Sequence, residues 1–190
     1  MRACKTLLAG MGVGLFLIAS AGAQTTNPPT TYIENFELQT GTILIKGFSP
    51  VGSVSLGDST VSVRVKATAD VWHTQKVYGI QMVLTRAGSQ SGGAASREVM
   101  VVDYDELDAL ASALEYLGKI TYEVTPLTGF DASFTTRSGI RFSAHSERRQ
   151  GGIQQSVRFG DGQKVLLTTE QLNQLRNLVT QAKSTLDAIK

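Results

Sequence analysis

Cysteine is almost missing from this sequence, and its placement removes it from the mature chain altogether. The single cysteine, Cys4, lies within residues 1–23. These residues have a basic start, an uncharged apolar run over about 7–21 and an Ala-Gly-Ala exit, which is typical of a cleaved secretory signal peptide. We expect cleavage before Gln24, which leaves residues 24–31 as a polar leader, and Ala19-Ser20-Ala21 is a second possible site. The mature chain then has no thiol, and this excludes disulfides, cysteine nucleophiles and thiolate metal sites.

An excess of charge of one sign is also missing. The full sequence has 18 Lys and Arg against 16 Asp and Glu, and two of the basic residues, Arg2 and Lys5, belong to the signal peptide. The mature chain is therefore formally neutral, and we expect no nucleic-acid partner. The sequence also lacks an Asn-x-Ser/Thr sequon. The absence of a sequon and the absence of a thiol in the mature chain favour a bacterial exported protein of the periplasm or the cell exterior.

Long hydrophobic runs are limited to the signal peptide. Its apolar run of about 15 residues is shorter than the roughly 20 residues that a spanning helix needs. We therefore expect no membrane span in the mature chain.

Familiar catalytic motifs are absent too. The sequence has only two histidines, His73 and His145, and it has no G-x-S-x-G or H-E-x-x-H motif. The Gly-rich segment 88–95 lacks the Gly-Lys-Ser/Thr ending of a phosphate-binding loop. We expect no cofactor and no metal. Glycosidase chemistry needs only two carboxylates, so an exported carboxylate-dependent hydrolase remains an alternative.

Alternation of apolar and polar residues dominates from Thr31 to Val102 and predicts antiparallel strands with one buried face. It is clearest over residues 61–66 and 78–84, where Val83 adds apolar character to the second face, as expected of a central strand. We expect a long hairpin loop over 88–95. Turn residues occur at Thr40-Gly41, Pro50-Val51-Gly52 and Gly57-Asp58.

At Asp103 the period changes to that of a helix. Leucines at 107, 110, 114 and 117 share one helical face, and Gly118 supplies a stop. The acidic run from Asp103 to Glu106 has the form of a capping box. It also has oxygen-rich spacing, but it lacks the Gly and Glu of a calcium-binding EF-hand loop, so capping is the favoured interpretation.

The remainder of the chain repeats this order of strands followed by a helix. Alternation predicts strands over 120–124, 140–144, 153–159 and 165–167, and core spacing from Leu172 to Leu186 predicts a last helix from about Thr169. Between the strands, turn residues occur at Pro126-Leu-Thr-Gly129, Ser138-Gly139, Gly151-Gly152 and Asp161-Gly162.

The predicted fold class is α+β, dominated by antiparallel sheet, with about 8–10 strands and two amphipathic helices in one domain over 32–190. A shift of 65 residues superposes the helices, with Asp103 on Thr168 and Leu107 on Leu172. This predicts two pseudo-repeats, 32–118 and 119–190, each of strands followed by a helix.

That order of elements resembles, at the level of fold, the Whirly family of single-strand-binding proteins. The resemblance implies a fold alone. Single-strand binders use a positive groove with interleaved aromatics, whereas this mature chain is neutral.

A basic stretch between Arg137 and Arg158 contains the candidate ligand-binding residues. Alternation places Arg141, Ser143 and His145 on one face of a strand. We expect either that this face binds an anionic glycan, a lipid head group or an acidic partner, or that it is a solvated face paired with the acidic helix. The candidate ligand-binding residues are Arg141, His145, Arg148 and Arg149.

An apolar pocket is expected between the helices and a curved sheet. Its candidate lining residues are Tyr78, Ile80, Phe142 and Phe159. The preferred interpretation is therefore an exported, non-catalytic binding or interaction module for a small ligand, glycan, lipid or envelope protein. A structural or assembly subunit of the cell envelope, joined through the leader or an uncovered strand edge, is a further alternative.

Overall fold

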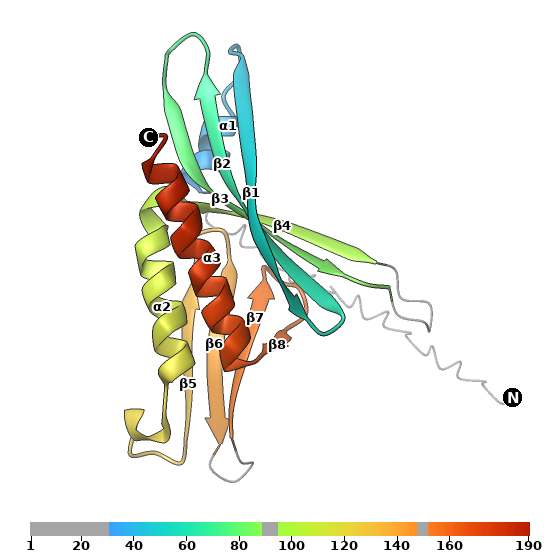
Figure 1. The fold of residues 1–190 in the computed structure, drawn as a ribbon, viewed down its shortest axis with the longest axis vertical. Helices are drawn as coiled ribbons and strands as arrows, with labels where there is room; N and C mark the ends of the chain where they lie inside the picture. The colour runs from blue at the N-terminus through green and yellow to red at the C-terminus, as the bar shows by residue number, and fades with distance from the viewer. Residues whose placement is uncertain (1–30, 89–94, 148–151) are drawn as a thin grey trace, which may run out of the picture.

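The computed structural model describes residues 31–88, 95–147 and 152–190 (Figure 1). The predicted signal peptide, nearly all of the leader, and the candidate residues Arg148 and Arg149 lie outside these ranges. Within the described ranges, no helix combines the length and the apolar character that crossing a membrane requires.

Two four-stranded antiparallel sheets, each followed by a helix, make up the fold (Figure 1). The first sheet has the order β1-β2-β3-β4, and the second has the order β5-β6-β7-β8. The first unit consists of β1 (Leu44–Leu56), β2 (Ser59–Asp70), β3 (Lys76–Arg86), β4 (Ser96–Asp103) and α2 (Leu107–Lys119). The second consists of β5 (Gly129–Thr135), β6 (Ile140–Glu147), β7 (Ile153–Phe159), β8 (Val165–Leu167) and α3 (Thr169–Asp187). The predicted α+β class, dominated by antiparallel sheet, is confirmed.

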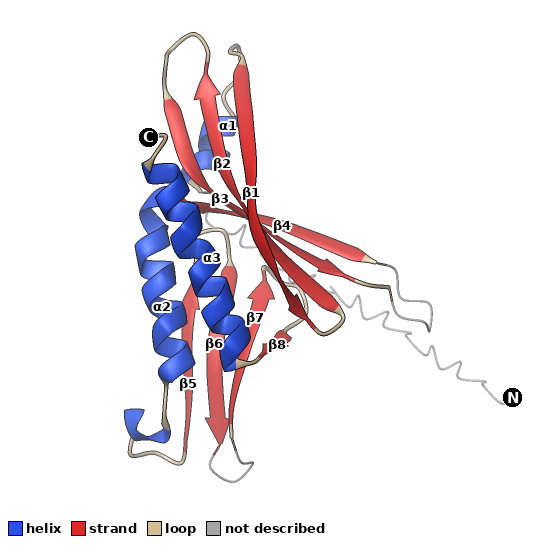
Figure 2. Cartoon of the chain, viewed as in Figure 1, coloured by secondary structure: helices blue, strands red, loops and turns tan. Residues whose placement is uncertain are grey.

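The two helices lie side by side and run in opposite directions (Figure 2). Ion pairs join them at both ends: Arg176 to Glu115 at 2.7 Å and Lys183 to Asp108 at 3.0 Å. Each helix covers the other unit's sheet, because α3 packs on β1, β2 and β3 while α2 packs on β5 and β6. The buried residues of both sheets and both helices consequently form one hydrophobic cluster.

The helical positions that superpose on a 65-residue shift are all buried. These pairs are Leu107 and Leu172, Leu110 and Leu175, Leu114 and Val179, and Leu117 and Ala182. The alternation in the first sheet is also confirmed, since Val61, Val63 and Val65 are buried and β3 lies between two strands with Val83 buried on its second face. The repeat is therefore present in the arrangement of elements, while common descent of the two units stays a prediction.

The prediction of a turn at Pro50-Val51-Gly52 is wrong. Strand β1 continues through it, and its register against β2 shifts between Pro50 and Gly52, which is a β-bulge. A proline lacks the N–H that a ladder needs, and an edge strand tolerates it at a bulge. A Cβ at Gly52 would lie 2.6 Å from Leu178 of α3, so the missing side chain lets this helix approach the bulge. The turns at Gly41 and Gly57 are present, both with positive φ.

Two segments expected to be strands are helical turns. Residues Tyr32–Glu37 form the short helix α1, which Thr31 caps in a reciprocal box with Glu34. Residues Tyr122–Val124 form a 3₁₀ turn, and the first strand of the second sheet is Gly129–Thr135 instead. Both segments are short, so apolar residues at alternate positions did not distinguish a strand from a single turn.

The C-terminal residue of α1, Glu37, is bound to the first sheet by ion pairs and a hydrogen bond. Glu37 accepts from Lys66 at 2.7 Å, from Lys46 at 2.8 Å and from the Thr68 hydroxyl at 2.7 Å. Burial would raise the pKa of Glu37, but the hydrogen bonds from the two lysines outweigh it and hold that pKa below its ordinary value. Lys66 is almost fully buried, and this pairing satisfies its charge.

Candidate functional site

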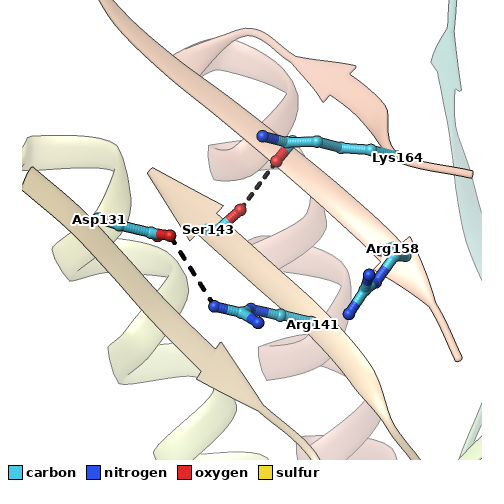
Figure 3. A pocket seen from close by; sticks show the side chains of 6 residues that line it. Asp131, Arg141, Ser143, Arg158 and Lys164 are labelled. Atoms are coloured by element: carbon cyan, nitrogen blue, oxygen red, sulfur yellow. Dashed lines mark hydrogen bonds and ion pairs between the residues drawn. The ribbon is translucent and has the colours of Figure 1, made fainter. Parts of the chain in front are cut away.

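Three accessible cationic side chains, Arg141, Arg158 and Lys164, gather on the outer face of the second sheet. Along β6 and β7 the alternation sends Phe142, Val157 and Phe159 into the core and leaves Arg141 and Arg158 on the opposite face. Figure 3 shows these polar side chains on the side of the strands that faces away from the helices. Arg141, Ser143 and His145 share this face, as the sequence predicted.

A hollow of about 190 Å³ lies on this face. Neighbouring strands supply its lining in register, because Arg141 stands directly opposite Arg158 and Ser143 directly opposite Ser156. We call this set the cationic hollow; its lining residues are Asp131, Arg141, Ser143, Ser156, Arg158 and Lys164 (Figure 3).

The hydrogen bonds in the cationic hollow leave much of its positive charge uncompensated. Arg141 donates to the Ser133 hydroxyl at 3.1 Å, and its distance to the Asp131 carboxylate is 4.0 Å. The hydroxyls of Ser143 and Ser156 are 2.9 Å apart. Within the described part of the chain, the side chains of Arg158 and Lys164 are exposed and make no hydrogen bond or ion pair. Three cations therefore face one carboxylate.

Two arginines placed directly opposite each other on neighbouring strands repel. No carboxylate lies between them to offset the repulsion, since Asp131 is on the far side of Arg141 (Figure 3). Guanidinium groups bind sulfate, phosphate and carboxylate oxygens through paired N–H donors, and the serine hydroxyls add further donors. The arrangement is thus suited to holding an anionic group.

Several members of this site were not among the predicted residues. The register of β6 against β7 is needed to see that Arg158 lies beside Arg141, and Lys164 lines the same hollow. Alternation across the hairpin gave only a partial signal. His145 lies on the same face, opposite Asp131 and Gln154 in the register, and is not a lining residue of the hollow.

The predicted apolar pocket residues divide between the core and a second cavity. Ile80, Phe142 and Phe159 are fully buried and pack in the hydrophobic core. Tyr78 lines a cavity of about 390 Å³ between α1, β3 and the start of α2, together with Tyr32 and Tyr104.

The rings of this second cavity already have cationic partners within the chain. The Arg137 guanidinium lies 4.7 Å from the centre of the Tyr32 ring, and the Lys190 ammonium lies 3.9 Å from that of Tyr104. The Tyr104 hydroxyl donates to Asp187, and this bond raises the pKa of the tyrosine. The cavity is therefore a weaker candidate than the cationic hollow, where the side chains of Arg158 and Lys164 have no partner among the described residues.

The acidic cluster at the start of α2 has a structural task that differs from the predicted one. Asp103 makes no capping hydrogen bond to its own helix, so that part of the prediction is wrong. Its carboxylate accepts from the backbone N–H of Tyr32 at 2.7 Å and of Ile33 at 3.1 Å, at the first turn of α1. It also accepts from Arg137 at 3.1 Å.

Arg137, between β5 and β6, neutralises the rest of this cluster. Its guanidinium donates to both oxygens of Asp105, at 2.8 and 2.6 Å, and this lowers the pKa of Asp105 below its ordinary value. Its backbone N–H donates to Glu106 at 2.9 Å. Burial raises the pKa of Glu106, whose second oxygen is buried without a hydrogen bond. The expected pairing of the basic stretch with the acidic helix thus holds for Arg137, whereas Arg141 and Arg158 point to the other face.

Comparisons of the sequence with family models and curated proteins, and of the fold with solved structures, give no match. The likeness to Whirly proteins therefore stays an expectation from the order of elements, and a function has to be inferred from the side chains.

Proposed function

We propose that this chain is an exported, non-catalytic module that binds an anionic polysaccharide through the outer face of its second sheet. The observation that carries the proposal is the directly opposed pair Arg141 and Arg158, joined by Lys164 on the rim of the same hollow. Like charges opposite each other cost stability. An anionic ligand bound between these cations would offset their repulsion.

The shape of the face favours a polymer over a small enclosed ligand. A hollow of about 190 Å³ has room for one sulfate, phosphate or carboxylate group with its immediate neighbours. The polar side chains extend beyond it along the strands, through Ser133 and Thr135 on β5 and His145 on β6. An extended chain of sugars with repeated anionic groups would use the hollow and these flanking hydroxyls together.

The acidic residues at the start of α2 support a binding role over a hydrolytic one. Asp103 and Asp105 are held by Arg137 and by the N–H groups of α1, so these carboxylates serve the fold. Export is part of the proposal through the signal-peptide pattern of residues 1–23.

Salt-gradient elution from immobilised heparin tests the proposal. We expect Arg158→Gln to elute at lower salt than the wild type, because it removes one of the two opposed guanidinium groups. The matched control is Arg97→Gln, since Arg97 is an exposed arginine on the outer face of the first sheet. It carries the same charge change and should elute with the wild type.

Equal elution of wild type, Arg158→Gln and Arg97→Gln would contradict the proposal. Equal weakening by both variants would show that net charge, and not this site, determines retention. Retention of the wild type on anionic phospholipid vesicles and not on heparin would replace the polysaccharide by a lipid surface.

A further inference from the structure

Strand β1 is an unusual sheet edge. It has 13 residues, whereas the other three edge strands, β4, β5 and β8, have 8, 7 and 3. Among the described residues it pairs with β2 alone. The backbone groups on its other side therefore offer a template for one more strand.

The first half of β1 projects beyond the helices (Figure 1). Residues 45–50 are exposed on both faces of the sheet, and further along the strand Leu178 of α3 lies against Gly52. Ile45 and Phe48 keep 60% and 47% of their surface accessible. Proteins protect long edges with charges, a proline, a β-bulge, short length or a covering element. Lys46 is the one charged residue between Leu44 and Leu56, and the proline and the bulge come only at the end of the segment 44–50.

We propose that β1 strands of two copies of this chain pair antiparallel about a two-fold axis and join two four-stranded sheets into one of eight strands. This interaction surface is separate from the cationic hollow and goes beyond the proposed binding function.

Symmetry and charge select the register of the pair. Hydrogen-bonded and non-hydrogen-bonded residue pairs alternate in an antiparallel ladder, so a two-fold axis must place one residue opposite its own copy. An axis at Lys46 would oppose two ammonium groups, which is unfavourable. An axis at Gly47 instead places Lys46 opposite Phe48 of the second copy, which keeps the two ammonium groups apart. Lys46 can keep its ion pair with Glu37 at 2.8 Å, and the Phe48 ring can keep the Arg64 guanidinium 4.6 Å from its centre.

Pro50 sets the length of the pairing. It lacks an N–H, and the bulge that follows it turns the strand away from a straight edge. With the axis at Gly47, Leu44 pairs with Pro50, so the whole segment before the bulge is used. Seven residues give a contact about 24 Å long, which is small for a permanent interface, and we expect a dissociation constant in the micromolar range.

Disulfide trapping tests this geometry. In a Cys4→Ser background, Gly47→Cys introduces the only thiol, and a Cβ at this position would meet just the Ala67 carbonyl oxygen at 3.9 Å. The matched control is Val99→Cys on the other edge strand of the same sheet, where Val99 is 44% exposed. We expect mild oxidation at about 100 µM protein to cross-link Gly47→Cys at least tenfold faster. Equal rates in the two variants would overturn the proposal.

Sedimentation of two charge variants tests the register. Phe48→Lys places an ammonium group opposite Lys46 of the second copy, and we expect it to weaken dimerisation at least tenfold. Phe48→Glu places a carboxylate there, and we expect it to dimerise at least as tightly as the wild type. Weakening by both variants would mean that an apolar patch holds the dimer, and a wild type that stays monomeric at 200 µM would exclude the pairing altogether.

Discussion

Asp103 and Thr168 occupy equivalent positions in the two units, directly before α2 and α3, but their side chains cap different helices. The Thr168 hydroxyl accepts from the N–H of Gln171 in its own helix, and the Gln171 side-chain oxygen accepts from the backbone N–H of Thr168. Asp103 turns away from α2 and accepts from the first N–H groups of α1. A 3₁₀ turn, Tyr104–Glu106, stands where the second unit has a regular first turn.

This difference shows that equivalent positions in a repeated arrangement can make different hydrogen bonds. The first unit has α1 to fasten, and the second has no such helix among its described residues. A carboxylate accepts several hydrogen bonds at once, whereas a hydroxyl accepts fewer. Asp103 thereby joins α1, the start of α2 and, through Arg137, the second sheet.

The two sheets also differ in the side chains on their outer faces and in the length of their first strands. The second sheet presents its opposed arginines to solvent, whereas the first presents Phe48 beside Arg64, with the guanidinium 4.6 Å from the ring centre. Its long edge, β1, has no counterpart in the second sheet, whose β5 has 7 residues. The shared core tolerates these differences because each unit's helix covers the other unit's sheet.

The largest expected effect on stability is at Asp103, which connects α1 to Arg137. Asp103→Ala leaves two N–H groups of α1 and the Arg137 guanidinium without their acceptor, and we expect a loss of about 3 kcal/mol in the free energy of unfolding. Asp103→Asn keeps one acceptor oxygen and should lose about half as much. Urea denaturation measures both. A loss no greater than that of Thr168→Ala would mean that the two positions are equivalent caps.

Removing the guanidinium of Arg137, which donates to Asp103, should lower the free energy of unfolding somewhat less. Arg137→Met keeps the length of the side chain, and we expect a loss of about 2 kcal/mol at pH 7, below the 3–5 kcal/mol of a fully buried pair, because Arg137 is 36% exposed.

This loss should also depend on pH. Arg137 holds the pKa of Asp105 below its ordinary value of 3.8, so its stabilising effect is present above about pH 4 and disappears as the pH falls through the lowered pKa. The difference between wild type and Arg137→Met in urea titrations should shrink below pH 4. A difference that stays constant down to pH 2 would assign the effect to packing.

The second unit's cap should give a smaller and simpler effect. Thr168→Ala removes one hydrogen bond at the start of α3, and we expect a loss of about 1 kcal/mol. Thr168→Asp should recover the stability, because aspartate is also a good capping residue. Failure of Asp to substitute for Thr would show that the Thr168 methyl group matters more than the cap.

The smallest expected effect on stability is at the cationic hollow. Arg158→Gln relieves the repulsion with Arg141, so the free energy of unfolding should stay equal or rise by a few tenths of a kcal/mol at low salt. The gain should vanish at high salt, where surface charges are screened. A loss above about 1 kcal/mol in urea denaturation would identify Arg158 as a structural residue.

Local patterns were sufficient to predict most of the fold. The alternation in β2 and the leucine spacing of α2 reflect which face of each element is buried, and the predictions from both patterns are confirmed. Helix α1 was missed, although Thr31 and Glu34 form a capping box, because six residues are too few for a helical period. The acceptor for its first N–H groups, Asp103, lies 70 residues away from Ile33 in the sequence.

The candidate site could be predicted only in part. Alternation placed Arg141 on an outer face, but its relation to Arg158 depends on how β6 pairs with β7. Lys164 joins through its position just before β8, and a strand of three residues gives almost no periodic signal. Long-range register, which the sequence pattern of one strand does not contain, decided the composition of the hollow.

Ligand-induced stabilisation tests the central claim most directly. A ligand that binds only the folded chain raises its stability, by about 2.7 kcal/mol at 100 times the dissociation constant. With a heparin-derived oligosaccharide as the probe, we expect this rise in urea denaturation of the wild type and Arg97→Gln, and none in the double variant Arg141→Gln/Arg158→Gln. An equal rise in all three proteins, or none in the wild type, would contradict the assignment of the cationic hollow as the binding site.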